Sequence, residues 1–282
     1  MLPKRDRYPA GVPCWVDTSQ PDAEAAASFY AGLFGWTVTD RMPPDADGHY
    51  FEAALDGGRV AGIGSASGGG PVTWMTYIAV DDADEAAERV RANGGSVITE
   101  PFDVYEAGRM AILADPQGAV FSVWQAGQHT GAEVVNAPES WNWSDLNTLD
   151  MEGAKRFYGA VFGWEFTDVD FGAGASVMVR RPGYSDYLES IDPGVRERHA
   201  EGGAPPGFTD AIAWFQPLRG AGPAHWNVVF RVADADASAA RVKELGGTVL
   251  SEPVDVPWSR VTTIRDSQGA VLTLSEFKPP QQ

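Results

Sequence analysis

The sequence has little cysteine, histidine or positive charge, and it has no long apolar run. A single cysteine, Cys14, excludes an intrachain disulfide and a cluster of thiolate metal ligands. The chain carries 21 basic and 39 acidic side chains, and the formal charge of −18 repels both nucleic acid and anionic lipid. No apolar stretch approaches the ~20 residues of a membrane span, and the charged start, "MLPKRDRYPAG", lacks the apolar segment of a signal peptide. We therefore expect a cytoplasmic protein whose partners are neither nucleic acid nor membrane.

A repeat divides the chain. Its 282 residues suit two domains, and 44% hydrophobic residues allow a substantial core in each. The octet "FYAGLFGW" at 29–36 returns as "FYGAVFGW" at 157–164, an offset of 128 residues. Farther on, "YIAVDDADEAAERV" at 77 answers "VFRVADADASAARV" at 229, and "DPQGAVFSV" answers "DSQGAVLTL". The offset there is 152 residues, so the second copy holds 24 more residues, near 181–208. We predict domains at 8–128 and 141–280, joined by a linker at 129–140.

Each copy reads as two smaller units of the same kind. In the first copy, "PCWVDTS" has a strand pattern, Pro21 suits the first position of a helix, and that helix ends at Gly35. Strand patterns follow at 36–40, 50–55 and 59–64, then a strand at 74–80, a helix at 83–95, and three more strands. The order β-α-β-β-β therefore occurs twice per domain. This predicts an α+β fold with curved, mostly antiparallel sheets, helices outside and a concave face inside. We expect one short helix and a loop in the 181–208 insertion, either as a lid or as a contact between domains or subunits.

The element order, the "FYxxxFGW" helix end and the "DPxG" turn resemble the vicinal oxygen chelate superfamily, which includes glyoxalase I, bleomycin-resistance proteins and extradiol dioxygenases. The linker "GQHTGAEVVN" is similar to that of two-domain members described as glyoxalase-like proteins or hydroxylases. The resemblance implies tandem βαβββ modules and, in metal-using members, ligands from the first and last strands of each half-domain. The matching positions are not good ligands: Trp15, Trp143, Met75, Asn227, Ser122 and Thr273. The remaining strands offer only Asp210. We therefore predict no metal and no cofactor.

The concave face of each domain is the predicted ligand site. Alternation on a strand places Asp17 on the face of Trp15, Tyr77 on that of Met75, and Trp124 on that of Ser122. The second domain offers Trp143, Asp145, Asn227, Val229, Thr273 and Ser275 at the matching places, a smaller and more polar set. Aromatic walls with a few polar groups suit a planar or hydrophobic small molecule. The recurring Trp36 and Trp164 are expected in the core.

Several charged or polar candidates have two readings. Asp17 and Asp145 could bind a ligand or act as a general base, or they could accept hydrogen bonds from free backbone N–H groups near a helix. Arg109 and Arg260 could hold an anionic group or form surface ion pairs. His129, in the linker motif, could reach a pocket or brace the domain interface, and we favour the interface. The other histidines, His49, His199 and His225, are expected to be structural or solvated.

Three functional hypotheses follow. The first is a metal-free protein that binds a small hydrophobic or aromatic molecule without turnover. The second is an enzyme of the same superfamily, a hydroxylase, lyase, isomerase or dioxygenase-like protein, with an Asp general base or relocated metal ligands. The third is a scaffold whose pockets are vestigial. Two linked domains can imitate the dimer of a smaller relative, so we expect a monomer with pseudo-dimeric domains or a homodimer.

Overall fold

The first half of the chain forms one curved sheet of eight strands. In a computed structural model of the protein, the described residues are 7–66, 68, 70–170, 175–218, 220 and 222–279. The strands of the first sheet are β1 (Pro13–Gln20), β2 (Thr37–Asp40), β3 (Tyr50–Leu55), β4 (Gly58–Ser65), β5 (Trp74–Ala79), β6 (Ser96–Val104), β7 (Gly108–Ala114) and β8 (Val120–Ala126). Their order across the sheet is β2-β3-β4-β1-β5-β8-β7-β6. Helices α1 (Ala23–Phe34) and α2 (Ala83–Ala92) follow β1 and β5, which gives the predicted pair of βαβββ units.

The second half repeats this arrangement. Its strands are β9 (Ser140–Thr148), β10 (Glu165–Asp170), β11 (Ala175–Arg180), β12 (Ala211–Pro217), β13 (His225–Val232), β14 (Thr248–Val256), β15 (Ser259–Arg265) and β16 (Val271–Phe277). They lie in the order β10-β11-β12-β9-β13-β16-β15-β14, which is the order of the first sheet. Helices α3 (Met151–Phe162) and α6 (Ala235–Glu244) correspond to α1 and α2. The predicted α+β class and tandem domains are confirmed, whereas the domain boundaries stay a prediction whose last residue, 280, lies outside the described residues.

The first helix of each domain begins and ends by the same chemistry. Asp22 caps α1 by accepting from Ala25 N at 2.9 Å, and Asp150 caps α3 by accepting from Gly153 N at 2.8 Å. Helix α1 starts at Ala23, so the expectation that Pro21 is its first residue is wrong; Pro21 precedes the cap. The helix ends at Gly35 as expected, because its φ of 71° is a left-handed conformation that glycine adopts without steric cost.

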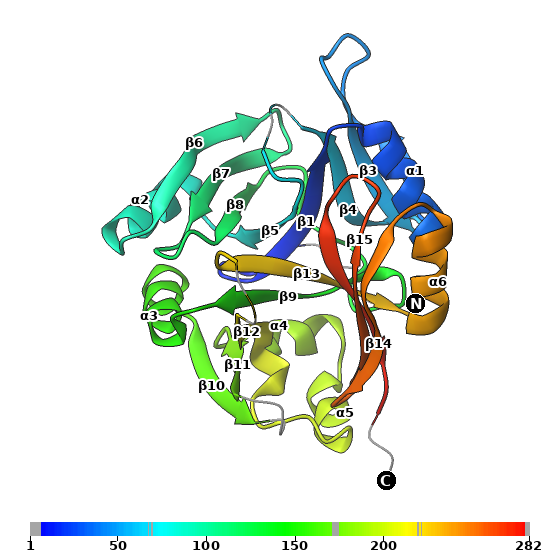
Figure 1. Ribbon diagram of the computed structural model, residues 1–282. Helices are drawn as coiled ribbons and strands as arrows, with labels where there is room; N and C mark the ends of the chain where they lie inside the picture. The colour runs from blue at the N-terminus through cyan, green and yellow to red at the C-terminus, as the bar shows by residue number, and fades with distance from the viewer. Residues whose placement is uncertain are drawn as a thin grey trace.

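The repeated octets connect the two domains reciprocally. Tyr30, in the first octet, donates to Asp266 Oδ2 of the "DSQG" turn at 2.8 Å. Tyr158, in the second octet, donates to Asp115 Oδ2 of the "DPQG" turn at 3.3 Å. The two tyrosines are fully buried. Figure 1 shows the corresponding helix pairs, α1 beside α6 and α2 beside α3. Each octet therefore supplies its own domain with core aromatics and the other domain with a buried hydrogen bond.

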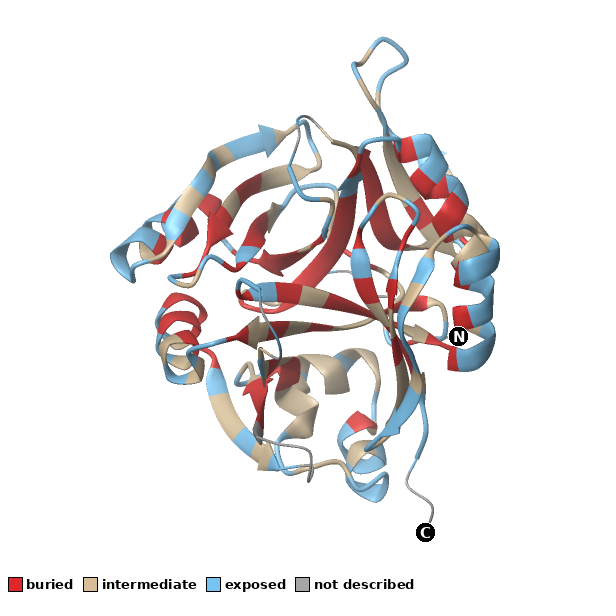
Figure 2. Ribbon diagram, in the orientation of Figure 1, coloured by how far each residue is buried: buried red, intermediate tan, exposed pale blue. Residues whose placement is uncertain are grey.

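The core lies around the central strands of both sheets, which are the most deeply buried part of the ribbon in Figure 2. Trp36 and Trp164 belong to it, at 4% and 3% exposure, as predicted. Each also donates to a backbone carbonyl outside its own domain: Trp36 Nε1 to Glu139 O of the predicted linker at 2.7 Å, and Trp164 Nε1 to Gly11 O of the first domain at 2.7 Å. No helix among the described residues is long and apolar enough to cross a membrane.

The insertion of the second domain is more ordered than expected. It contains two short helices, α4 (Tyr184–Ile191) and α5 (Val195–Glu201), followed by the 3-10 turn η1 (Phe208–Asp210). The expectation of one short helix and a loop is therefore wrong. Glycines with positive φ, Gly183 and Gly194, precede the two helices and allow the chain to turn sharply before each. Figure 1 shows α4 and α5 against the concave side of the second sheet.

Candidate functional site

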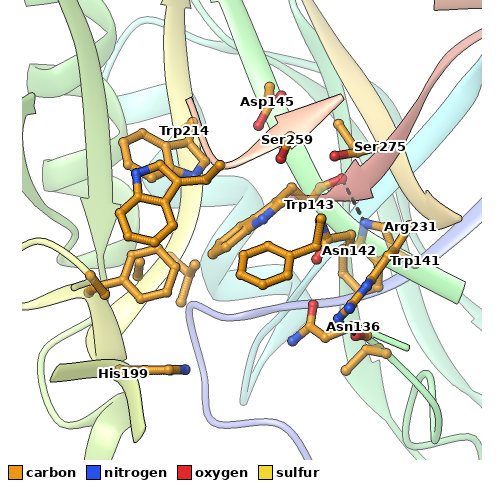
Figure 3. Close-up of a pocket in the computed structure, with 18 of the residues that line it drawn as sticks. Asn136, Trp141, Asn142, Trp143, Asp145, His199, Trp214, Arg231, Ser259 and Ser275 are labelled. Atoms are coloured by element: carbon orange, nitrogen blue, oxygen red, sulfur yellow. Dashed lines mark hydrogen bonds between the residues drawn. The ribbon is translucent and has the colours of Figure 1, made fainter. Parts of the chain in front are cut away.

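A cavity of about 760 Å³ lies in the concave face of the second domain. Strands β9, β12, β13 and β16 supply its floor, and the insertion and the β14–β15 turn supply other walls. Among the residues that line it are Trp143, Asp145, Phe208, Trp214, Arg231 and Trp258. Figure 3 shows the polar side chains of Asp145, Asn142 and Arg231 around Trp143. The volume falls within the range of about 300–1,000 Å³ that is usual for small-molecule sites.

The wall of this cavity carries a carboxyl group with an oxygen that lacks a partner. Asp145 lies on β9, and its Oδ1 is buried without a hydrogen bond among the described residues. Burial raises the pKa of this carboxyl to about 7, because no nearby donor or cation stabilises its charged form. A buried carboxylate oxygen without a donor costs free energy, so a ligand that brings an O–H or N–H group would remove that cost.

Aromatic rings form the middle of the cavity. The centroid of Trp143 is 5.9 Å from that of Phe208 and 6.3 Å from that of Trp214, with both pairs close to edge-on. Phe208 comes from the insertion, so the insertion contributes directly to the surface of the cavity. Trp258, at the β14–β15 turn, lies beside the insertion, since a Cβ at Gly203 would be 3.2 Å from its Cη2 atom. Such walls favour a flat apolar molecule.

An arginine lies on the cavity wall at some distance along the strands from Asp145. Arg231, on β13, donates from Nη1 to Asn136 O at 2.8 Å, and its Cζ lies 5.5 Å from the centroid of Phe277. Arg231 forms no salt bridge with a carboxylate among the residues that the structure describes. The cavity therefore combines one carboxyl group, one arginine and an aromatic middle.

The matching cup of the first domain is occupied by its own side chains. Asp17 Oδ2 accepts from Tyr77 at 2.8 Å and from Tyr50 at 3.2 Å, and Tyr50 in turn accepts from Trp15 Nε1 at 3.0 Å. Trp15, Asp17 and Tyr77 are all buried, at 3%, 8% and 7% exposure. Burial raises the pKa of Asp17 to about 6, while the two tyrosine donors lower it. The carboxyl group here belongs to an internal network.

His129 lies in this first cup, although we favoured the domain interface from the sequence. Its ring is edge-on to Trp15 with centroids 4.5 Å apart, and its carbonyl accepts from Trp124 Nε1 at 2.8 Å. Burial, followed by the charge of Arg59, lowers the pKa of His129 to about 4, so the ring is neutral at pH 7. The predicted residues Trp15, Asp17, Tyr77, Trp124 and His129 are thus brought together, as parts of one packed cluster.

Strand register explains why one cup is filled and the other is open. Gly62 faces Asp17 across β1 and β4, and Trp214 faces Asp145 across β9 and β12. A Cβ at Gly62 would lie 2.2 Å from the hydroxyl oxygen of Tyr50, so only glycine leaves room for that ring. In the second domain Tyr77 is replaced by Val229, which faces Trp143 across the β9–β13 pair. Tyr50 stands two residues before the strand partner of Gly62. At the equivalent position in the second domain, two residues before the partner of Trp214, stands Ser176, whose hydroxyl group bonds Gln216 at 2.7 Å.

Neither Asp17 nor Asp145 caps a helix. The caps of the helices that follow are Asp22 and Asp150, so the alternative reading of Asp17 and Asp145 as caps is not what the structure shows. Arg109 pairs with Asp84 and Asp103, at 2.7 and 3.0 Å. Arg260 makes the equivalent contacts with Asp236 and Asp255, at 2.7 and 3.1 Å. Neither arginine is among the residues around the cavity, and their anion-binding role stays a prediction.

The positions that the resemblance marks for metal ligands do not form a donor set. In the second domain Asn227 Nδ2 donates to Thr273 Oγ1 at 3.1 Å, and Trp143 offers no lone pair. In the first, Met75 pairs across the strands with Asp17, and Ser122 pairs with Tyr77. Among the described residues the one group of three potential ligands is Asp234, Asp236 and Glu276, near the start of α6 and away from the cavity. The positions that the resemblance marks therefore supply no set of donors for a divalent ion.

Several cavity residues were missed by the sequence reasoning, notably Trp214, Arg231, Phe208 and Trp258. Two of them carry a signal in the repeat, because the offset of 152 residues aligns Gly62 with Trp214 and Ala79 with Arg231. The first replacement adds an aromatic ring to the wall of the second cup, and the second adds a charge. The other histidines lie elsewhere or at its edge: His49 bonds Asp40 at 2.7 Å, His225 bonds Pro223 O, and His199 lines the cavity beside Phe208.

Comparison with known proteins bears on both halves of the chain. A family model described as "Glyoxalase/Bleomycin resistance protein/Dioxygenase superfamily" matches residues 15–123. A model described as "Glyoxalase-like domain" matches residues 143–275.

Two relatives match almost end to end. A Mycobacterium tuberculosis protein named "Putative glyoxylase CFP32" is 36% identical over 99% of this chain and 100% of its own. A Streptomyces protein named "Anthracycline biosynthesis protein DauV" is 37% identical over 96% of this chain and 95% of its own.

Solved structures share the fold. The Mn(II)-bound glyoxalase from Novosphingobium aromaticivorans has a TM-score of 0.59 at 16% identity, covering 95% of this chain and 82% of that one. The 2,3-dioxygenase LapB from Pseudomonas sp. KL28 has a TM-score of 0.59 at 13% identity, covering 96% of this chain and 95% of that one.

Proposed function

The chain belongs to the Glyoxalase/Bleomycin resistance protein/Dioxygenase superfamily, and on that premise we propose that it binds a planar aromatic small molecule in the cavity of its second domain, without a metal ion. The observation that carries the proposal is the cavity of about 760 Å³ with Trp143, Phe208 and Trp214 on its walls. The relative named for anthracycline biosynthesis supports an aromatic ligand of several fused rings.

The experiment compares the two cups directly. The fluorescence of the protein is titrated with doxorubicin, a soluble anthracycline, and with 2-naphthol as a smaller aromatic probe. Val229→Tyr introduces into the second cup the side chain that the first cup has at Tyr77. We expect this variant to weaken binding by at least tenfold. The new ring fills the cavity, and its hydroxyl group donates a hydrogen bond to Asp145.

The matched control is Tyr77→Phe, which alters only the first cup and should leave binding unchanged. Saturable binding of at least one probe by the natural protein, lost in Val229→Tyr, supports the proposal. No saturable binding of either probe, or equal binding by Val229→Tyr, contradicts it. Thermal unfolding of each variant shows whether it is folded.

The metal-free part of the proposal has its own measurement. The cup positions offer tryptophan, amide and hydroxyl groups, and the Asn227 amide already bonds Thr273, which supports a site without a divalent ion. Elemental analysis of protein purified without chelators should give far less than one divalent ion per chain, and dialysis against EDTA should leave ligand affinity unchanged. One tightly held ion per chain, with affinity lost on its removal, contradicts this part.

A second candidate function is supported by Asp145. A carboxyl group with a pKa of about 7, beside an aromatic cavity, can take up a proton from a bound molecule near neutral pH. In that case the protein is an enzyme with Asp145 as its general base. Mass spectrometry of the bound probe after incubation distinguishes the two functions. Chemical change that Asp145→Asn abolishes, with binding retained, favours the enzyme, whereas an unchanged probe favours the binding protein.

A further inference from the structure

The polar groups of the cavity are separated along the strands that form its floor. Asp145 faces Asn227 across β9 and β13, whereas Arg231 faces Ser140. Arg231 is therefore four residues along β13 from the partner of Asp145, which at ~3.3 Å per residue is about 13 Å of strand. Trp143 faces Val229 between these two pairs. Figure 3 shows the ring of Trp143 between Asp145 and Arg231.

The two ends have opposite hydrogen-bonding character. Asp145 is partly exposed on the cavity wall and accepts no hydrogen bond from a described residue; of its two oxygens Oδ1 is the buried one, so the other is the acceptor that a ligand can reach. Arg231 presents N–H groups only, of which Nη1 bonds a backbone carbonyl, Asn136 O, at 2.8 Å. Arg231 lies on the cavity wall and forms no salt bridge among the described residues, although its charge also acts on the carboxyl group of Glu139. Arg198, also on the wall, differs because it pairs with Asp192 at 2.5 Å.

The first domain lacks this polarity. At the offset of the repeat, Ala79 stands where the second domain has Arg231, and the oxygen of Asp17 is held by Tyr77. Both changes that create the two ends are therefore confined to the open cup. A protein that only filled its core would need neither an unpaired carboxyl oxygen nor an arginine there.

We propose that the cavity selects an elongated aromatic molecule with a hydroxyl or amino donor at one end and a carboxylate or carbonyl oxygen at the other. Asp145 accepts from the donor, Arg231 donates to the oxygen, and the rings lie against Trp143. The separation favours two or more fused rings over a single ring. This inference rests on the proposed function and adds the ligand class and the two residues that determine specificity.

The test uses three probes, of which the second and the third each differ from the first at one end only. 6-Hydroxy-2-naphthoic acid has both groups, 6-methoxy-2-naphthoic acid lacks the donor, and 2-naphthol lacks the carboxylate. Isothermal titration should give the natural protein at least tenfold higher affinity for the first probe than for either of the others. Since all three share the naphthalene rings, their difference isolates the two ends.

Two variants assign the preferences to residues. Arg231→Met keeps the apolar stem and should abolish the preference for the carboxylate while keeping that for the hydroxyl group. Asp145→Leu removes the acceptor at similar size and should do the reverse. Arg265→Met, an exposed arginine on β15 away from the cavity, is the control and should bind all three probes as the natural protein does.

The outcomes separate this inference from the proposed function. Equal affinities of the three probes for the natural protein overturn the inference and leave the aromatic cavity standing. Equal losses for all three probes in Arg231→Met and Asp145→Leu overturn the residue assignment. Failure of every probe, together with failure of doxorubicin, overturns both. If a variant does not fold, the comparison of probes on the natural protein still decides.

Discussion

The two cups of this chain start from the same strand position and reach opposite results. Asp17 and Asp145 stand at equivalent points of β1 and β9, and burial raises the pKa of both carboxyl groups, to about 6 and about 7. In the first cup two tyrosines donate to Asp17, and the rings of Trp15 and Tyr50 occupy the space. In the second cup no described side chain donates to Asp145 Oδ1. An unpaired polar group of this kind lowers stability, and proteins tolerate such groups mainly at sites of function.

Duplication explains how both results can coexist. One copy can fill its cup with its own side chains while the other keeps a cavity open, because the fold needs both sheets but not both cavities. The reciprocal bonds of Tyr30 with Asp266 and of Tyr158 with Asp115 connect the cores of the two copies. The side chains of the filled cup are thus part of the hydrophobic core, whereas the open cup encloses a cavity at the same place.

The largest effect is expected at Gly62. Gly62→Ala would place a Cβ 2.2 Å from Tyr50 Oη and 3.0 Å from Asp17 Cβ, so the Tyr50 ring must leave and Asp17 loses one donor. We expect a loss of about 3 kcal/mol in the free energy of unfolding, measured by urea denaturation. Gly70→Ala is the control, since a Cβ at Gly70 has open space around it.

A loss at Gly62→Ala that is no greater than at Gly70→Ala would show that the first cup has room to spare, and the contrast between the cups would then fail. Two ligand sites per chain in Gly62→Ala, in place of one, would contradict the contrast between the cups more directly. This result would mean that displacing Tyr50 opens a second pocket.

The fold was largely predictable from the sequence because the repeat preserves its signals. The octets, the "DPQG" and "DSQG" turns and the Trp36 and Trp164 pair appear twice at constant offsets, and identical local chemistry gives identical strand order. The insertion at 181–208 was located by the change in offset, whereas its two helices were not expected. Tyr184, Leu188 and Phe208 of the insertion line the cavity, a contact with the distant strands that the sequence alone does not reveal.

The site was less predictable, because it depends on contacts between residues far apart in the sequence. The sequence reasoning placed Trp143 and Asp145 on one face of β9 by alternation, and both line the cavity; their role in binding stays a prediction. It could not tell that Tyr50 reaches Asp17 from β3, because that contact depends on Gly62 in another strand. Likewise, the partner of each octet tyrosine lies in the other domain, which pairing within one copy does not reveal.

An intermediate effect is expected from neutralising the two carboxyl groups. Asp145 holds its proton up to a pKa of about 7 in the folded state, against about 3.9 when unfolded, so ionisation destabilises the fold as pH rises from about 4 to 7. Asp145→Asn should therefore raise the free energy of unfolding at pH 8, by on the order of 1–3 kcal/mol. The gain should shrink toward pH 5, as urea titrations at both pH values would show.

Asp17→Asn is the matched variant and should have the opposite sign at pH 5. The amide oxygen can still accept from Tyr77 and Tyr50, but the new N–H groups are buried against their hydroxyl oxygens in a packed cluster. A loss of about 1–3 kcal/mol is expected. If both variants change stability in the same direction at pH 5 and pH 8, the difference in hydrogen bonding between the cups is not what distinguishes them.

The smallest effect concerns the two octet tyrosines, whose bonds are equivalent but not equally supported. Tyr30→Phe leaves Asp266 Oδ2 with a second donor, Gln20 Nε2 at 2.8 Å. Among the described residues, Asp115 Oδ2 has no second donor besides Tyr158, because the backbone N–H groups of the turn donate to Oδ1. Tyr158→Phe should therefore cost more, by about 1 kcal/mol, because an orphaned buried oxygen is worse than a shared one.

Removing the second donor tests this reason. In the Tyr30→Phe background, Gln20→Met should raise the cost to that of Tyr158→Phe, while Gln20→Met alone should cost less because Tyr30 still donates to Asp266. A non-additive pair of this kind, measured by a double-mutant cycle in urea, locates the difference between the copies in Gln20. Strict additivity, or equal costs for the two tyrosine variants, would mean that the copies contact each other with the same strength and that their asymmetry is confined to the cups.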